Sequence, residues 1–380
     1  MAAMLYSFDH HLKNCELYYH NAIFNRGPLL SLYRKVDFVV FHHSVTTVWN
    51  RERFLSKIKS WQKCDFGAAR KIALMQDEYK NNDLLQRFVQ ELSIERVFTL
   101  APNTQWNAIY GNQIVNRGIL TQYLAGYLET NEHKPMENDK RDIDIGYRTD
   151  WTKMHVKLGS TGMLKRNIAH IVDQSAREQG LSTNIRIGSE HFIKGDDWNR
   201  FLRRCRYVIG VPSGSSVLDK SGDIEAQLAA RLRENPKVEE NLLYREIVES
   251  CDGSLLLEVL SPRHFEAILN GCGQILIESD YNGVLVPWVH YLPLKRDFSN
   301  LQEIMALAAD EELRLTMVRN SQRDIVSSQQ YSYKSFVDLV IPSHERSEIL
   351  TPQKKSFAKV FNELTEAVKK LLLKLRFQFI

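Results

Sequence analysis

Two glutamates and an arginine are the residues whose types and spacing suggest the most specific chemistry. Glu258 and Glu266 lie eight positions apart, and Arg263 stands three residues before Glu266, so a helix would place Arg263 and Glu266 on one face. A carboxylate at a helix N-terminus can accept hydrogen bonds from ribose or hexose hydroxyls, and a guanidinium can bind diphosphate oxygens through two hydrogen bonds. The alternative is a chance pair on an exposed helix face, held by a weak ion pair.

The sequence around these residues, SPRHFEAILNGCGQILIESDYNGVLVPWVHYLPLKRDFSN, resembles the C-terminal domain of group 1 glycosyltransferases, especially bacterial polysaccharide and antigen-type members. Glu258 and Glu266 look like the Glu-x7-Glu motif of that family. The resemblance covers roughly residues 140–340 and includes a downstream pattern of His290, Tyr291, Asp297 and Asn300. It implies that Glu266 contacts the ribose of a donor nucleotide and that Glu258 lies near the sugar.

The same resemblance implies basic side chains, here Arg148 and Lys165, against the donor diphosphate, with Arg263 as a further donor-binding residue. Arg148 ends a predicted strand, and Lys165 lies in the first turns of a predicted helix after LGSTG. A glycine-containing turn that leads into a helix offers free N–H groups and a partial positive charge to an anion. Solvated helix charges are the alternative for Lys165 and Arg166.

A loop of small and hydroxyl-bearing residues, PSGSSVLD, follows the predicted strand YVIGV. Ser215 in this loop is a candidate donor-binding residue, because a small side chain lets the backbone approach phosphate or base. A tight turn that caps the following segment is the alternative interpretation.

Polar residues follow the predicted strands of the N-terminal half. The strand VDFVVF ends at His42 and His43, and the strand KIALMQ ends at Asp77 and Glu78. Ligands bind at the carboxyl ends of strands in open parallel sheets. We therefore predict His42 and Asp77 as catalytic candidates on one rim, together with Glu258, with simple capping of strands and loops as the alternative.

The elements that would position these residues alternate between short β-branched strands and longer helical patterns, which is typical of parallel βαβ units. A chain of 380 residues and 44.2 kDa exceeds what one hydrophobic core usually serves. We predict an α/β protein with two Rossmann-like domains that face each other across a cleft, the GT-B type. The predicted domains are an acceptor-side domain over 1–138, a nucleotide-sugar-binding domain over 139–345, and a basic amphipathic C-terminal helix over 346–380.

The predicted C-terminal helix has apolar residues at helical spacing and lysines on its remaining face. Residues 354–379 could therefore make a peripheral contact with an anionic membrane, although packing against the N-terminal domain is favoured. A net charge of +4 on so long a chain gives no sign of nucleic-acid binding. The five cysteines have no paired spacing, and no apolar run approaches the ~20 residues of a membrane span. We expect free thiols and a cytoplasmic protein, with the inner membrane face as a second location.

These patterns together predict a glycosyltransferase that moves a sugar from a nucleotide-sugar donor to a saccharide, lipid-linked or other hydroxyl acceptor. We expect no cofactor and no metal, because the single Asp-x-Asp triplet, Asp142 to Asp144, opens a predicted strand instead of ending one. The Glu-x7-Glu resemblance favours retention of configuration, and a base from the N-terminal rim would favour inversion. A sugar-nucleotide epimerase or hydrolase of the same fold, or a non-catalytic GT-B-like binding protein, are the alternatives.

Overall fold

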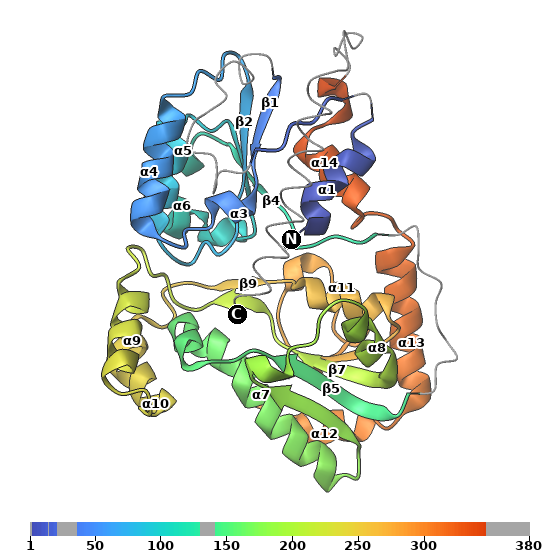
Figure 1. Ribbon diagram of the computed structural model, residues 1–380. Coiled ribbons are helices and arrows are strands. Elements are labelled where there is room, and N and C mark those ends of the chain that lie inside the picture. Colours follow the sequence, from blue (N-terminus) through green and yellow to red (C-terminus); the bar gives the residue numbers. More distant parts are fainter. Residues whose placement is uncertain (1, 14, 21–35, 130–140, 347–380) are drawn as a thin grey trace.

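The first of two parallel sheets is built from the N-terminal part of the chain (Figure 1). The computed structural model describes residues 2–13, 15–20, 36–129 and 141–346. The strand order is β1-β2-β3-β4, and each pair is parallel. The strands are β1 (Phe38–Phe41), β2 (Arg70–Leu74), β3 (Arg96–Thr99) and β4 (Leu120–Gln122), and the connecting helices are α3 (His43–Thr46), α4 (Arg51–Gln62), α5 (Asn82–Glu91) and α6 (Trp106–Val115).

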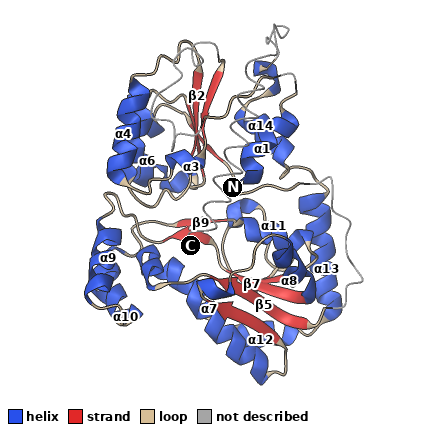
Figure 2. Cartoon of the chain, in the orientation of Figure 1, coloured by secondary structure: helices blue, strands red, loops and turns tan. Residues whose placement is uncertain are grey.

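The second parallel sheet has five strands in the order β11-β10-β7-β5-β6. Its strands are β5 (Ile143–Thr149), β6 (Thr183–Ile187), β7 (Cys205–Gly210), β10 (Gly273–Ile277) and β11 (Leu292–Leu294). The helices around it are α7 (Gly159–Glu178), α8 (Asp196–Arg204), α11 (Pro262–Leu269), α12 (Leu301–Leu307) and α13 (Glu311–Ser321). Figure 2 shows strands gathered in each half of the molecule with helices around them, which confirms the prediction of two Rossmann-like domains.

The central strands of the second sheet are apolar because helices cover both of their faces. All five residues of β10 are buried, and so are five of the six residues of β7. Such continuous apolar runs are typical of parallel strands covered on both sides. On α7, Leu164, Ile168 and Val172 recur every fourth residue, and all three pack into the core beneath the sheet.

The first domain also contains elements from distant parts of the chain. The helices α1 (Ala2–His11) and α14 (Tyr333–Val340) pack together beside it (Figure 1). Phe336, Val337 and Val340 are fully buried in the core of the first domain. The sequence pattern predicts these residues in the second domain, but their hydrophobic contacts join them to the first.

A small antiparallel sheet of two strands, β8 (Ser213–Ser215) and β9 (Leu257–Val259), lies between the two domains. Leu257 and Val259 are 3% exposed and belong to the core of the first domain, although the chain reaches them from the second sheet. The residue between them, Glu258, points to the other side of the strand. Strand β9 therefore brings residues from the second half of the chain into the core of the first domain.

The segment between β8 and β9 carries two helices, α9 (Asp223–Glu234) and α10 (Glu240–Leu243). Leu228 and Leu243 of these helices share a small core with Trp151 and Val156. The loop before α9 reaches the first domain, where Asn81 N donates to Asp219 O and Asp219 N donates to Tyr79 O, both at 2.8 Å. These main-chain hydrogen bonds fix the two domains to each other at one end of the space between them.

All five cysteines are free, as the sequence predicts. Within 2–13, 15–20, 36–129 and 141–346, no helix is long and apolar enough to cross a bilayer. The predicted amphipathic helix over 346–380, with its proposed membrane contact through 354–379, lies outside the described residues except for Arg346.

Candidate functional site

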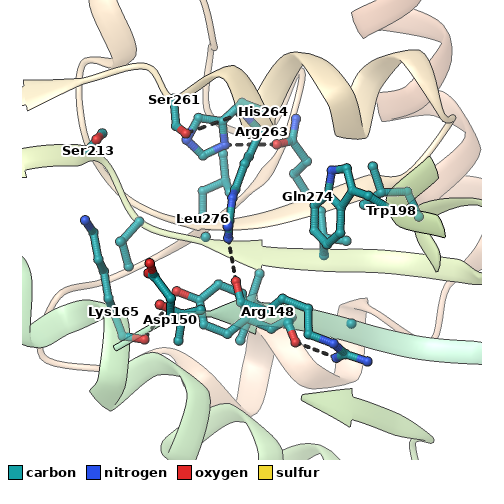
Figure 3. Close-up of a pocket in the computed structure, with 18 residues that line it drawn as sticks. Arg148, Asp150, Lys165, Trp198, Ser213, Ser261, Arg263, His264, Gln274 and Leu276 are labelled. Atoms are coloured by element: carbon teal, nitrogen blue, oxygen red, sulfur yellow. Dashed lines mark hydrogen bonds between the residues drawn. The ribbon is translucent and has the colours of Figure 1, made fainter. Parts of the chain in front are cut away.

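A cavity of about 240 Å³ opens in the second domain at the carboxyl ends of β5 and β7 (Figure 3). It lies between the sheet and the helices α8 and α11. Its lining contains Arg148, Lys165 and Arg263, three of the five residues that the sequence analysis assigned to donor binding. The other polar lining side chains are Tyr147, Thr149, Asp150, Trp198, Ser213, Ser261, His264 and Gln274.

Lys165 supplies a cation to this cavity. Its ammonium group makes no hydrogen bond and no ion pair with any residue that the structure describes. Burial lowers the pKa of Lys165, a change that Asp150 and Asp77 oppose and Arg263 strengthens. A cation held in a buried site without an anionic partner is stabilised when an anion binds beside it.

Arg263 supplies the second cation and spans the cavity. It starts from the first turn of α11, and its Nη1 donates to the main-chain oxygen of Arg148 on β5 (Figure 3). Its guanidinium lies 5.5 Å from the ring centroid of Trp198, whose Nε1 donates to Glu266 at 2.7 Å. Glu266 is therefore joined to the cavity through Trp198.

Arg148 lines the cavity, but its guanidinium forms hydrogen bonds with oxygen atoms of the protein itself. Arg148 Nη1 donates at 2.7 Å to the main-chain oxygens of Tyr147 and Asn184, and Nη2 donates to Asn184 Oδ1 at 2.8 Å. The guanidinium also stacks 4.2 Å from the ring centroid of Phe201. Arg148 is predicted to contact a diphosphate, but in the structure these bonds hold its guanidinium under α8.

We therefore expect Arg148→Met to lower the free energy of unfolding by about 1–3 kcal/mol, since it leaves buried carbonyl oxygens without donors. Nucleotide-sugar affinity should change less than threefold. Urea unfolding and titration calorimetry measure the two quantities. A large loss of affinity with unchanged stability would contradict the structural role.

The floor of the cavity is polar. Gln274 on β10 is 1% exposed, and its Oε1 lies 3.2 Å from Nδ1 of His264. Burial lowers the pKa of His264 to about 4, although the hydrogen bond with Gln274 opposes this. Gln274 Nε2 has no hydrogen-bond partner among the described residues. Buried polar groups are almost always hydrogen-bonded, so a ligand or a water molecule is expected to accept from this amide.

The predicted anion site at the start of α7 already has an anionic partner. The carboxylate of Asp252 accepts from Ser160 N at 3.2 Å, and Ser216 Oγ accepts from Thr161 N at 3.2 Å. Partial burial raises the pKa of Asp252, but hydrogen bonds from Ser216, Tyr244 and Ser160 hold this pKa below its ordinary value. The N–H groups that the sequence analysis took as free are capped by the protein itself.

Ser215, a predicted donor-binding residue, is not part of the cavity lining. Its side chain is fully buried, and its hydroxyl donates to the main-chain oxygen of Val217 at 2.9 Å. Ser213, two residues earlier, lines the cavity instead. Ser213 and Ser215 are the two ends of β8, and Gly214 between them has a φ of 131°, so the regular alternation of a strand is interrupted there.

Glu258 lies on β9, away from the cavity lining. It accepts from Ser279 Oγ at 2.9 Å and forms an ion pair with Arg296. Its side chain is 11% exposed. Neither Glu258 nor Glu266 belongs to the cavity lining, so the structure does not bring the two glutamates together there.

Asp77 of the first domain faces the second. It follows β2 with a φ of 56°, in the left-handed region, and it is partly buried. Burial raises the pKa of Asp77, although the charges of Lys80, Lys157 and Lys165 oppose this. Two of those lysines belong to the second domain. The carboxyl ends of both parallel sheets therefore face one space between the domains. The two Rossmann-like domains thus face each other, as the sequence predicts.

His42 follows β1 at the same edge of the first sheet and is more enclosed than Asp77. It caps α3, where its Nδ1 accepts from Ser44 N at 3.3 Å, and its Nε2 is buried without a partner among the described residues. Burial lowers the pKa of His42 to about 4. The ring is neutral at neutral pH, and a base with so low a pKa accepts a proton weakly.

The Asp-x-Asp triplet lies at the amino end of β5, away from the cavity. Asp142 pairs with Arg204 at 2.5 Å and Asp144 pairs with Arg206 at 2.8 Å. In the part of the chain that the structure describes, no group of three or more His, Cys, Asp or Glu side chains could hold a metal ion.

No protein-family model matches the sequence, and no curated protein matches it. Among solved structures, HepE from Anabaena in complex with UDP-glucose aligns with a TM-score of 0.44 and 9% identity, over 82% of this chain and 79% of HepE. TarM aligns with a TM-score of 0.42 and 9% identity, over 75% of this chain and 51% of TarM. The lipopolysaccharide outer core galactosyltransferase WaaB aligns with a TM-score of 0.31 and 11% identity, over 81% of this chain and 76% of WaaB. This chain thus spans about half the length of TarM.

Sequence reasoning missed several residues of the cavity, above all Asp150, Trp198 and Gln274. Asp150 could have been found, because it directly follows the strand that ends at Thr149. Trp198 and Gln274 sit within a helix and a strand, where their residue types alone do not separate cavity lining from core.

Proposed function

We propose that this protein transfers a sugar from a nucleotide-activated donor to a hydroxyl acceptor, with the donor bound in the cavity of the second domain. The supporting observation is the pair of cations, Lys165 and Arg263, that line this cavity without a carboxylate ion pair among the described residues. A diphosphate is the ligand that two such cations suit. The cavity faces Asp77 across the domains, as a reaction between two bound substrates requires.

In this proposal Lys165 and Arg263 bind the diphosphate oxygens and stabilise the negative charge of the departing nucleotide. Glu266, held by Trp198, takes the ribose hydroxyls that the family resemblance assigns to it. Gln274 donates from the floor to an acceptor atom of the ligand. This division of roles needs no metal ion, because protein cations supply the positive charge.

We propose that the carboxylate of Asp77 takes the proton of the acceptor hydroxyl. A raised pKa makes a carboxylate a better proton acceptor, and Asp77 lies on the domain opposite the proposed donor site. Proton removal by Asp77 would give inversion of configuration. Retention remains the second candidate, because the spacing of Glu258 and Glu266 resembles that of retaining enzymes. Proton NMR of the first-formed product distinguishes the two outcomes.

The test is a thermal-shift screen of the full chain against UDP-, GDP-, ADP- and CMP-linked sugars, with and without chelator. We expect one nucleotide class to raise the unfolding midpoint, unchanged by chelator, since a ligand that binds only the folded state stabilises it. The hit is then incubated with immobilised glycans and lipid-linked sugars. Transfer supports the proposal, nucleotide release without acceptor indicates a hydrolase, sugar isomerisation indicates an epimerase, and no shift indicates a binding protein.

A further inference from the structure

Trp49, between α3 and α4, is 73% exposed, whereas Trp288 on the second domain is 49% exposed. Single apolar residues on a surface are ordinary, so exposure alone indicates nothing. Trp49 differs in how its backbone is held and in what lies against its ring.

The backbone on both sides of Trp49 is fixed. Val48 before it is 3% exposed, and Thr46 Oγ1 donates to Leu74 O of β2 at 2.7 Å. Asn50 after it caps α4 by accepting from Arg53 N at 2.9 Å. The indole therefore projects from a rigid point, and little conformational entropy is lost when something binds to it.

A lysine fixes the ring from one side. Lys80 Nζ lies 5.3 Å from the ring centroid of Trp49, and the same ammonium pairs with Glu225 of α9 at 3.2 Å. Glu225 also pairs with Lys157 of the second domain at 2.7 Å. These contacts from Trp49 through Lys80 and Glu225 to Lys157 place Trp49 beside the contact between the domains, on the side that carries Asp77.

We propose that Trp49 is a stacking platform for a pyranose ring of the acceptor. A sugar presents C–H groups on one face and hydroxyls at its edge, and an indole offers a flat apolar surface of similar size that also tolerates water. Lys80 lies against the ring and pairs with Glu225, so stacking on the indole requires no charged group on the sugar. The inference rests on the proposed transfer function, because it concerns the acceptor.

The experiment measures binding of the full chain to an array of immobilised oligosaccharides, in the wild-type protein and three variants. Trp49→Ala should lower binding to the preferred sugar at least tenfold, and Trp49→Phe should restore it to within threefold of wild type. The matched control is Trp288→Ala, which removes an exposed indole from the second domain and should leave binding unchanged.

Nucleotide-sugar binding is measured on the same samples by thermal shift. Unchanged nucleotide binding with lost glycan binding in Trp49→Ala supports the inference. Wild-type binding to no sugar, equal binding by Trp49→Ala, or equal losses in Trp49→Ala and Trp288→Ala would overturn it and leave the donor site intact. Failure of the proposed function would appear instead as absent nucleotide binding in the wild-type protein.

Discussion

Replacing Lys165 with methionine should weaken binding of the preferred nucleotide sugar by about 10- to 150-fold, which corresponds to one or two charge-assisted hydrogen bonds. Methionine preserves the length and the apolar contacts of the lysine stem and removes only the charge. Because burial lowers the pKa of Lys165, removing the ammonium should not destabilise the folded protein. Calorimetric titration gives the affinity, and thermal unfolding without ligand gives the stability.

Arg166→Met is the matched control, since it removes a cation from the neighbouring position of α7. Arg166 already has an anionic partner, Glu240, at 3.4 Å, and it is absent from the cavity lining. We expect its effect on affinity to stay below threefold. Equal losses in the two variants would mean that general positive charge, not the cavity, attracts the ligand.

The arrangement of strands and helices could be predicted from the sequence, because their periodicities are strong and local. The run KIALMQ became β2, and the helical pattern from about 50 to 62 became α4. Packing at long range was not predictable. The strand β9, which pairs with β8, and the helix α14 join the first domain through contacts with residues far away in the sequence, which no local pattern records.

The sequence predicted only part of the candidate site, because here too some contacts join residues that are distant in the sequence. Lys165 and Arg263 lie where strand ends and helix starts suggested. The sequence could not show that Arg148 is bound by Asn184 or that Asp252 caps α7, because both partners are more than 30 residues away and are defined only by the fold. Glu258 and Glu266 have the spacing of a motif, but Glu258 is on a strand whose side chains alternate.

Asp77→Asn should abolish most of the transfer activity and stabilise the protein. The loss of activity should be about 100-fold or more, because an amide cannot take the proton of an acceptor hydroxyl. Stability should rise by about 0.5–2 kcal/mol at pH 7.5, since asparagine removes a buried charge and accommodates the left-handed φ of 56° with less strain. A residue that destabilises the folded protein in its native position is typical of a functional site.

The stability gain should depend on pH in a defined direction. Because the pKa of Asp77 is raised above 3.8 in the folded state, the folded protein holds this proton more tightly than the unfolded chain, and ionisation costs stability as pH rises through the raised pKa. The advantage of Asp77→Asn should therefore be present at pH 7.5 and shrink as pH falls towards 4, as urea unfolding at the two pH values would measure. Asp83→Asn, whose carboxylate pairs with Arg51 on the surface, is the control and should show neither effect. A variant of Asp77 that kept its activity within threefold would remove this carboxylate from the proposed chemistry, whatever its stability.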